Sequence, residues 1–266
     1  ALGYYQDEEG STACKECPAG YYCGDSDGTI SPTSCDAGTE CPPMSYAATD
    51  CSQGTYGPNV TAASCIECPK SYFCQNPRTL VPEACPAGYY CPSNSSLPTP
   101  CPIGTFGNGT LLGSESDCTQ CTGGMYCDQT RLTYPVGYCA PGYFCGGGSA
   151  TRFPDTPDYI TINYIGDTCL SVKNDTMNNR CPPGHYCEEG SSSPTPCPPG
   201  TNSSTIGLQS LDACQPCMQG MYCPHYAQAF AIDVCEAGYY CPTGTANPTL
   251  NTTLECPLGH RCPPGS

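Results

Sequence analysis

Cysteine is the residue whose chemistry and spacing dominate this chain. There are 28 cysteines among 266 residues, and their thiols could hold zinc or form disulfides. Four Cys-x-x-Cys pairs, which begin at Cys14, Cys65, Cys118 and Cys214, have the spacing of zinc ligands. Further ordered cysteines and Asn-x-Ser/Thr sequons accompany each pair, a combination typical of an oxidising compartment. We therefore expect disulfides, no bound metal and a secreted or cell-surface protein.

Ten pairs of cysteines lie six positions apart around a near-constant filler. They span residues 17–23, 35–41, 68–74, 85–91, 121–127, 139–145, 181–187, 217–223, 235–241 and 256–262, with CPAGYYC as the commonest form. Nine of the ten have glycine at the third filler position, and eight have Tyr or Phe before the second cysteine. This pattern predicts a tandem array of small cross-linked turns.

Sequence alone leaves the pairing of these cysteines open. Each six-spaced pair could close on itself around its glycine, or consecutive pairs could cross. Crossing gives spans of 17 or 18 residues throughout, and we favour it for that regularity. The crossed disulfides would be Cys17–Cys35, Cys23–Cys41, Cys68–Cys85, Cys74–Cys91, Cys121–Cys139, Cys127–Cys145, Cys217–Cys235 and Cys223–Cys241. The longer loops are expected to close as Cys51–Cys65, Cys101–Cys118 and Cys197–Cys214.

The fold class follows from composition. Gly and Pro number 30 each and only 12% of residues are charged, so every run long enough for a helix is interrupted. Disulfides, each contributing about 3 kcal/mol, must replace a conventional apolar core. We predict small disulfide-rich modules in tandem, an elongated rod of short strands, turns and loops with almost no helix. The expected repeats are 1–50, 51–100, 101–196 with an insertion at 146–180, and 197–266.

The surface is acidic and carries glycosylation signals. The formal charge is −16, which argues against nucleic acid as a partner. Six sequons lie at Asn59, Asn94, Asn108, Asn174, Asn202 and Asn251, and we expect covalent N-glycans. We predict no resident cofactor, although weak Ca²⁺ binding is left open; GDSDG (24–28) resembles the start of a calcium loop but has Ile30 where that loop needs glycine.

The remaining chemistry-bearing residues do not form a recognisable catalytic set. The histidines are His185, His225 and His260, and no Ser/His/Asp or Cys/His pattern has a scaffold to hold it. We therefore predict a protein that is not an enzyme. The tyrosines before the second cysteines are expected to pack against the disulfides, and some could stack on sugar faces.

The insertion and the two ends are the candidate contact surfaces. In the insertion, YITINYI contains a strand pattern, with Tyr159, Ile160, Ile162, Tyr164 and Ile165 as the candidate contact residues. This strand packs on its own repeat or docks a neighbouring subunit. The ends have the form of two parts of one long loop, so we expect a segment of a longer polypeptide or one period of a polymer, with the partners of Cys14 and Cys169 left open. No apolar run long enough to insert into a membrane is present.

The CPxGT(Y/F) segments followed by Cys-x-x-Cys resemble the ephrin-receptor-like cysteine-rich repeat, and the layout is similar to tumour-necrosis-factor-receptor modules. In that resemblance Cys51–Cys65 corresponds to the first disulfide of a module and the crossed pairs to the second and third. Arrays similar to these repeats occur in surface and secreted proteins of protists and algae, including flagellar mastigonemes. The resemblance implies a structural glycoprotein of a self-associating extracellular fibre or flagellar surface coat. Other surface glycoproteins are the further partners that we expect. The alternative is a receptor or adhesin ectodomain that binds a protein ligand.

Overall fold

The chain folds into two compact units of short hairpins. The computed structural model describes residues 2–24, 30–154, 178–231, 233–250 and 252–266. One compact unit comprises Ala1–Pro102, Phe106–Thr119 and Thr130–Tyr134, and the other comprises Ile103–Thr105, Gln120–Gln129 and Pro135–Ser266. The helical content of the described residues is three 3-10 turns: η1 (Glu115–Asp117), η2 (Leu211–Ala213) and η3 (Thr252–Leu254). The predicted fold class, tandem disulfide-rich modules of short strands and turns with almost no helix, is confirmed.

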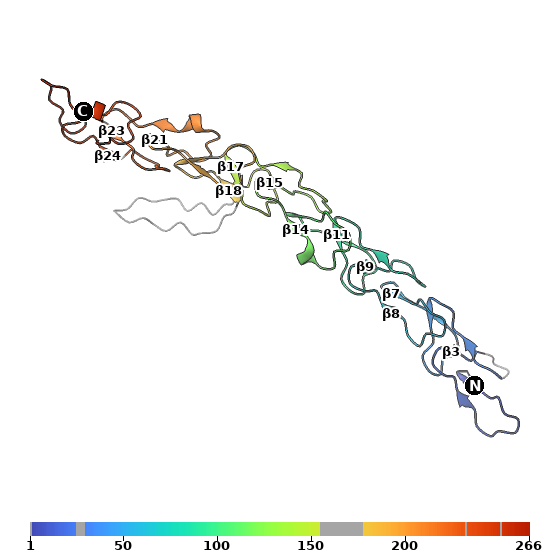
Figure 1. Ribbon diagram of the computed structural model, residues 1–266. Helices are drawn as coiled ribbons and strands as arrows, with labels where there is room; N and C mark the ends of the chain where they lie inside the picture. The colour runs from blue at the N-terminus through green and yellow to red at the C-terminus, as the bar shows by residue number, and fades with distance from the viewer. Residues whose placement is uncertain (1, 25–29, 155–177, 232, 251) are drawn as a thin grey trace. The chain divides into compact units, whose positions relative to one another are not determined.

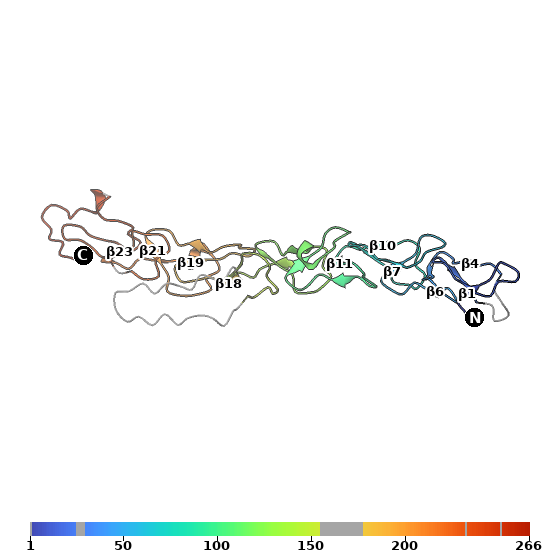
Figure 2. The same cartoon turned by 90° about the horizontal axis from the view of Figure 1, so that it is seen from below.

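The strands are two or three residues long and follow one another as antiparallel hairpins (Figure 1). In the first compact unit β1 (Tyr4–Tyr5) pairs with β2 (Lys15–Glu16), β3 (Tyr21–Tyr22) with β4 (Thr33–Ser34), β5 (Thr39–Glu40) with β6 (Thr49–Asp50), β7 (Thr55–Tyr56) with β8 (Ile66–Glu67), β9 (Tyr72–Phe73) with β10 (Glu83–Ala84), and β11 (Tyr89–Tyr90) with β12 (Thr99–Pro100). In the second, β15 (Met125–Tyr126) pairs with β16 (Gly137–Tyr138), β17 (Tyr143–Cys145) with β18 (Asn178–Arg180), β19 (His185–Tyr186) with β20 (Thr195–Pro196), β21 (Thr201–Asn202) with β22 (Gln215–Pro216), and β23 (Met221–Tyr222) with β24 (Asp233–Val234). β13 (Thr105–Phe106) and β14 (Thr119–Gln120) each have residues in both compact units. The same succession of hairpins and loops is visible from a second side in Figure 2.

The segment CPAGYYC at 85–91 illustrates how the sequence makes each hairpin. Gly88 has φ +83°, a left-handed conformation that glycine adopts without steric cost. The Tyr89 N–H donates to Pro86 O at 3.3 Å and closes a turn of type II geometry. The reversal brings the Cα atoms of Cys85 and Cys91 to 5.9 Å, inside the range that a disulfide spans. Strand β11 follows directly.

The structural repeat is one such turn with its linker, which we call a turn module. The glycines of successive turn modules are 16 to 21 residues apart, with serine at position 71 and a longer step from Gly142 to Gly184. Backbone hydrogen bonds join each turn module to the next: Gly88 N–H donates to Gly107 O at 2.8 Å, and Cys101 N–H donates to Gly88 O at 2.9 Å. The predicted repeats near 50 residues therefore each hold about three turn modules.

A second turn, found in most of the linkers that the structure describes, joins turn modules that are not consecutive in sequence. Arg131, which lies in such a turn at φ +65°, donates its N–H to Cys101 O at 3.2 Å. Its carbonyl oxygen lies so close to Gly88, two turn modules back, that a Cβ built on this glycine would be 2.4 Å from it. The Gly88 turn module is thus fixed to both of the following ones, whereas a Cβ built on Gly238 or Gly259 would meet nothing within 4 Å.

The core consists mainly of sulfur. Among the described residues, the buried apolar side chains are disulfide cysteines together with a few others, of which Phe73, Phe106 and Leu208 are the large ones. A typical small cluster contains Phe73, Cys85 and Cys91, with Tyr89 packed against it. The disulfides therefore supply both the cross-links and most of the buried apolar surface.

The insertion predicted at 146–180 begins and ends in one hairpin. Cys145 pairs in register with Asn178, and Tyr143 with Arg180, so residues 146–177 connect β17 to β18 within a single turn module. Ring contacts fix its base, because Tyr143 meets Phe153 edge-on with centroids 5.6 Å apart. The next turn module starts at Cys181 with the usual hydrogen bond, from Cys181 N–H to Gly142 O at 2.8 Å.

Candidate functional site

The disulfides are the feature that the sequence predicts most strongly, but the six-spaced cysteines do not form the crossed pairs that we favoured. Every six-spaced pair closes on itself: Cys17–Cys23, Cys35–Cys41, Cys68–Cys74, Cys85–Cys91, Cys121–Cys127, Cys139–Cys145, Cys181–Cys187, Cys217–Cys223, Cys235–Cys241 and Cys256–Cys262. The three long loops close as expected, through Cys51–Cys65, Cys101–Cys118 and Cys197–Cys214. The structure therefore has the alternative pairing, in which the two cysteines of each six-spaced pair bond each other across their own turn.

The crossed disulfides Cys17–Cys35, Cys23–Cys41, Cys68–Cys85, Cys74–Cys91, Cys121–Cys139, Cys127–Cys145, Cys217–Cys235 and Cys223–Cys241 are therefore wrong. The spacing of 17 or 18 residues that favoured them is the period of the turn module, not the length of a closed loop. Within each six-spaced pair the left-handed turn, at a glycine or at Ser71, already places the two sulfurs within bonding distance, so no sulfur is left for a neighbour. The crossed pairs that the receptor resemblance implied are absent for the same reason.

The three long loops are turn modules whose second cysteine is replaced. Positions 57 and 107 are glycine and position 203 is serine, and their N–H groups still make the usual bond, as from Gly107 N–H to Leu132 O at 2.8 Å. The first cysteine, left without its usual partner, bonds the cysteine at the end of the loop. The signal for this substitution was present in the sequence, because CSQGTYG and CPIGTFG align with CPAGYYC.

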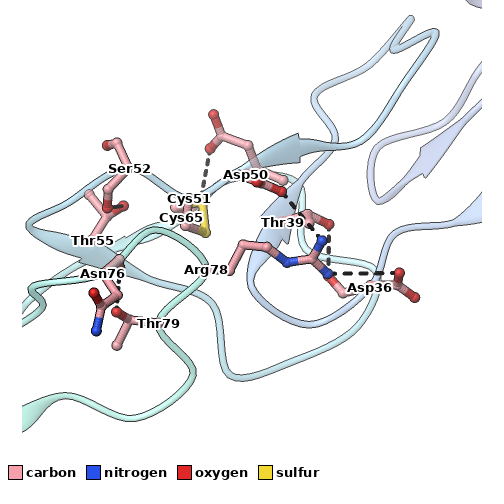
Figure 3. The surroundings of a disulfide bond; sticks show 11 residues. Asp36, Thr39, Asp50, Cys51, Ser52, Thr55, Cys65, Asn76, Arg78 and Thr79 are labelled. Carbon is pink, nitrogen blue, oxygen red and sulfur yellow. Dashed lines mark hydrogen bonds and ion pairs between the residues drawn. A yellow bond between two sulfur atoms is a disulfide. The ribbon is translucent and has the colours of Figure 1, made fainter.

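Arg78 makes the clearest polar contact between turn modules (Figure 3). It lies in a second turn at φ +58°, and its backbone N–H donates to Cys51 O at 3.0 Å. Its guanidinium is 3.5 Å from a carboxylate oxygen of Asp50 and 3.9 Å from one of Asp36. All three side chains are largely exposed, so these ion pairs contribute little to stability, and the backbone bond holds the turn in place.

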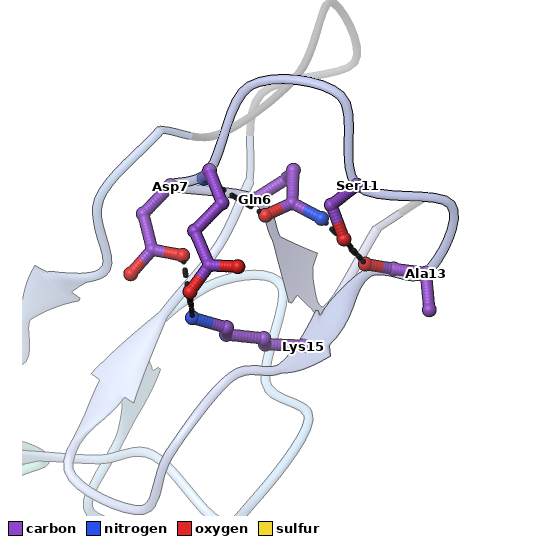
Figure 4. Close-up of polar contacts among 6 residues, drawn as sticks. Gln6, Asp7, Ser11, Ala13 and Lys15 are labelled. Atoms are coloured by element: carbon purple, nitrogen blue, oxygen red, sulfur yellow. Dashed lines mark hydrogen bonds and ion pairs between the residues drawn. The ribbon is translucent and has the colours of Figure 1, made fainter.

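The loop before the first Cys-x-x-Cys pair is closed by Lys15 (Figure 4). Its Nζ is 2.8 Å from Asp7 Oδ1 and 3.0 Å from Glu8 Oε1. The hydrogen bond to Lys15 lowers the pKa of Asp7, and the bonds to Asp7 and then Glu8 raise the pKa of Lys15. Cys14, beside this lysine, is exposed and is the one cysteine of the described residues without a disulfide.

Asp117 caps the loop that Cys101–Cys118 closes. Its Oδ2 accepts hydrogen bonds from the N–H groups of Gly113 (2.9 Å) and Ser114 (3.0 Å), and Lys70 Nζ is 3.9 Å away. The bond from Gly113, followed by that from Ser114, lowers the pKa of Asp117. The equivalent loop before Cys214 has Ala213 at this position, so η2 does not have this cap.

Five of the six tyrosines before the second cysteines are half-buried, in agreement with packing against the disulfides, and Tyr240 is exposed. Tyr186 packs against a cluster of Cys197, Cys214 and Leu208. Burial raises the pKa of Tyr222, and the facing Asp233 adds to this shift. Each of these five side chains is therefore partly covered by the protein and partly open to solvent.

The sequons differ in accessibility. The side chains of Asn59, Asn94 and Asn108 are exposed. Asn202 is half-buried in β21, and its amide, oriented to satisfy both neighbours, donates to Gln215 O (3.2 Å) and accepts from Ala231 N–H (2.9 Å). A glycan on Asn202 would replace one of the two Nδ2 hydrogens at this half-buried position.

Several predicted positions lie outside the described residues. They are the contact strand with Tyr159, Ile160, Ile162, Tyr164 and Ile165, the sequons at Asn174 and Asn251, Cys169, and most of the GDSDG segment. For the described part of the chain, no group of three or more His, Cys, Asp or Glu side chains could hold a metal ion. His185 is half-buried, with Nδ1 3.0 Å from Pro183 O, whereas His225 and His260 are exposed.

Comparison with known proteins returns neither a matching family model nor a matching curated protein. None of the helical turns in the described residues is long or apolar enough to cross a bilayer. The density of disulfides identifies a disulfide-stabilised protein of the extracellular type, because such bonds form and persist in oxidising compartments.

Proposed function

We propose that this chain is a structural glycoprotein subunit of an extracellular fibre, filament or surface coat, similar to a mastigoneme protein, with no enzymatic activity. The observation that carries the proposal is the repeated backbone network, in which most of the described turn modules bond the next and contact the one after it. The Gly88 module illustrates this, with bonds to Gly107 and Cys101 and the close approach of Arg131. A surface that repeats along the chain suits lateral or end-to-end association more than capture of one small ligand.

The disulfides would limit extension under load. Six residues fully extended span about 20 Å, whereas the Cα atoms of Cys85 and Cys91 stay 5.9 Å apart. A force that breaks the hydrogen bonds between turn modules can therefore lengthen only the linkers. This is the mechanical behaviour that a stiff extracellular fibre requires.

Charge and glycans would keep the surface hydrated. The net charge of −16 opposes non-specific aggregation, and the exposed sequons at Asn59, Asn94 and Asn108 lie in the second-turn linkers that separate turn modules. We propose that association uses surfaces away from these glycans.

Negative-stain electron microscopy of native material tests the proposal. We expect ordered filaments or sheets that label with an antibody against this chain and that come apart in strong reductant. The matched control is the same preparation in high salt without reductant, which should leave them intact. Isolated molecules bound to a second surface protein would contradict the proposal and support the receptor or adhesin alternative, which rests on the family resemblance.

A further inference from the structure

Three threonines occupy one repeated position that the disulfide pattern does not explain. Thr33, Thr99 and Thr195 each follow a proline, in the segments SPTSC, LPTPC and SPTPC. Each begins the second strand of a hairpin and lies two residues before the first cysteine of a turn module. All three side chains are exposed.

The same register brings each of these threonines opposite a tyrosine. Thr33 pairs with Tyr22, Thr99 with Tyr90 and Thr195 with Tyr186. Residues directly opposite each other in an antiparallel pair have Cβ atoms about 5 Å apart on one face of the hairpin. Each exposed hydroxyl therefore stands beside a half-buried aromatic ring.

The neighbouring prolines fix this backbone without harming the hairpin. Pro100 lies opposite Tyr89, whose N–H is bonded to Pro86 O, so this position needs no N–H from residue 100. A residue that precedes proline is held extended, which applies to Thr99 and Thr195. The acceptor hydroxyl is presented on a short extended segment that a modifying enzyme can reach in the folded protein.

We propose that Thr33, Thr99 and Thr195 are sites of O-linked glycosylation, and that the first sugar stacks on the facing tyrosine. Clusters of Ser and Thr with Pro are typical of O-glycosylated segments. In the transfer, threonine Oγ1 bonds to the anomeric carbon of a nucleotide-activated sugar, the bond from that carbon to the nucleotide phosphate breaks, and the hydroxyl proton leaves to a base of the transferase. No oxidation or reduction takes place.

The chain has a built-in control at Thr49. This threonine is exposed at the same position of its hairpin, but its neighbours are Ala48 and Asp50, and it pairs with Glu40. It lacks both the proline and the aromatic partner. Our proposal therefore predicts no sugar on Thr49.

Glycopeptide mapping of native protein by electron-transfer mass spectrometry tests the proposal. We expect hexose or N-acetylhexosamine mass on Thr33, Thr99 and Thr195 and none on Thr49. The inference rests on the proposed function in one respect, because both assume that the protein passes through the secretory pathway. An N-glycan on Asn94, which lies on the same peptide as Thr99, would show that the molecule has done so. Bare threonines beside a glycosylated Asn94 overturn the inference and leave the proposed function standing, as does sugar confined to neighbouring serines or to hydroxylated prolines.

Three variants of the secreted full chain separate attachment from stacking. Thr99→Val should remove one O-glycan and Thr49→Val none. Tyr90→Leu should keep the sugar on Thr99 but expose it, so that an exoglycosidase trims it about fivefold faster, as loss of an aromatic contact of about 1 kcal/mol implies. Equal trimming rates in Tyr90→Leu and the parent chain would overturn the stacking.

Discussion

The contact between Gly88 and Arg131 can be tested by comparing two glycine substitutions. Gly88→Ala places a methyl group 2.4 Å from Arg131 O, which is closer than real Cβ atoms approach a backbone atom. Gly238→Ala is the matched control, because Gly238 has the same turn position at φ +89° but meets nothing within 4 Å. Both variants carry the cost of a left-handed alanine, and only the first also disturbs the turn module two further along the chain.

The expected magnitudes follow from these two costs. A left-handed conformation costs a residue with a Cβ about 1–2 kcal/mol, which corresponds to roughly tenfold easier local opening. In Gly88→Ala the turn at Arg131 must also move, and the bonds from Arg131 N–H to Cys101 O and from Gly107 N–H to Leu132 O weaken. At about 1 kcal/mol for each bond, this adds about 30-fold, or about 300-fold in total.

Native-state amide hydrogen exchange with disulfides intact measures both effects. In Gly88→Ala we expect the amides of Arg131 and Gly107 to exchange about 300-fold faster than in the parent chain. In Gly238→Ala the amide of Cys256, which donates to Gly238 O at 2.8 Å, should exchange about tenfold faster. Accelerations that agree within threefold between the two variants would refute the claim that turn modules two apart are in contact.

Three further predictions concern single positions. Partial reduction followed by alkylation should label Cys85 and Cys91 together, and a peptide that links either one to a cysteine of another turn module would contradict the pairing. Ser71→Gly should relieve the strain of a serine at φ +76° and stabilise the turn by about 1 kcal/mol; the Cys85 amide, which donates to Ser71 O, should then exchange about fivefold more slowly, and unchanged exchange would count against strain there. The lowered pKa of Asp117 means that its cap is complete above the usual aspartate value of about 3.9 and is lost as the pH falls through its folded pKa. Nuclear magnetic resonance of the Gly113 amide between pH 2 and 6 should show that transition, and Asp117→Asn should abolish it.

Much of the local structure could be predicted from the residues themselves. The filler Pro-x-Gly between two cysteines encodes a turn, and the aromatic pair after it encodes a strand, so the hairpins at β3 and β11 follow from CPAGYYC. The long-loop disulfides could be predicted because Cys51, Cys101 and Cys197 begin segments with no second cysteine in the usual place. The second turns could not, because residues such as Arg78 and Leu111 are left-handed there without being glycine, and no local signal marks them.

The pairing of the six-spaced cysteines shows why spacing was insufficient. Both schemes give regular intervals, because any repeat of fixed length spaces equivalent cysteines equally. What separates them is the position of the Cα atoms after the chain has reversed at Gly88, and that depends on the turn geometry. The tendency of Cys-x-x-Gly to reverse the chain is the feature of the sequence that favours the self-closed pairs.

The sequence by itself determined the chemistry of this protein: a chain with many cysteines, many glycines and few large apolar residues must be held by sulfur, one turn at a time. The tertiary structure alone decided which turns touch. The contact of Gly88 with Arg131 needs a glycine at one side but only a backbone carbonyl at the other, which every residue possesses, so the identity of residue 131 carries no record of its partner. Their selection depends on how the turn modules stack after each one has formed.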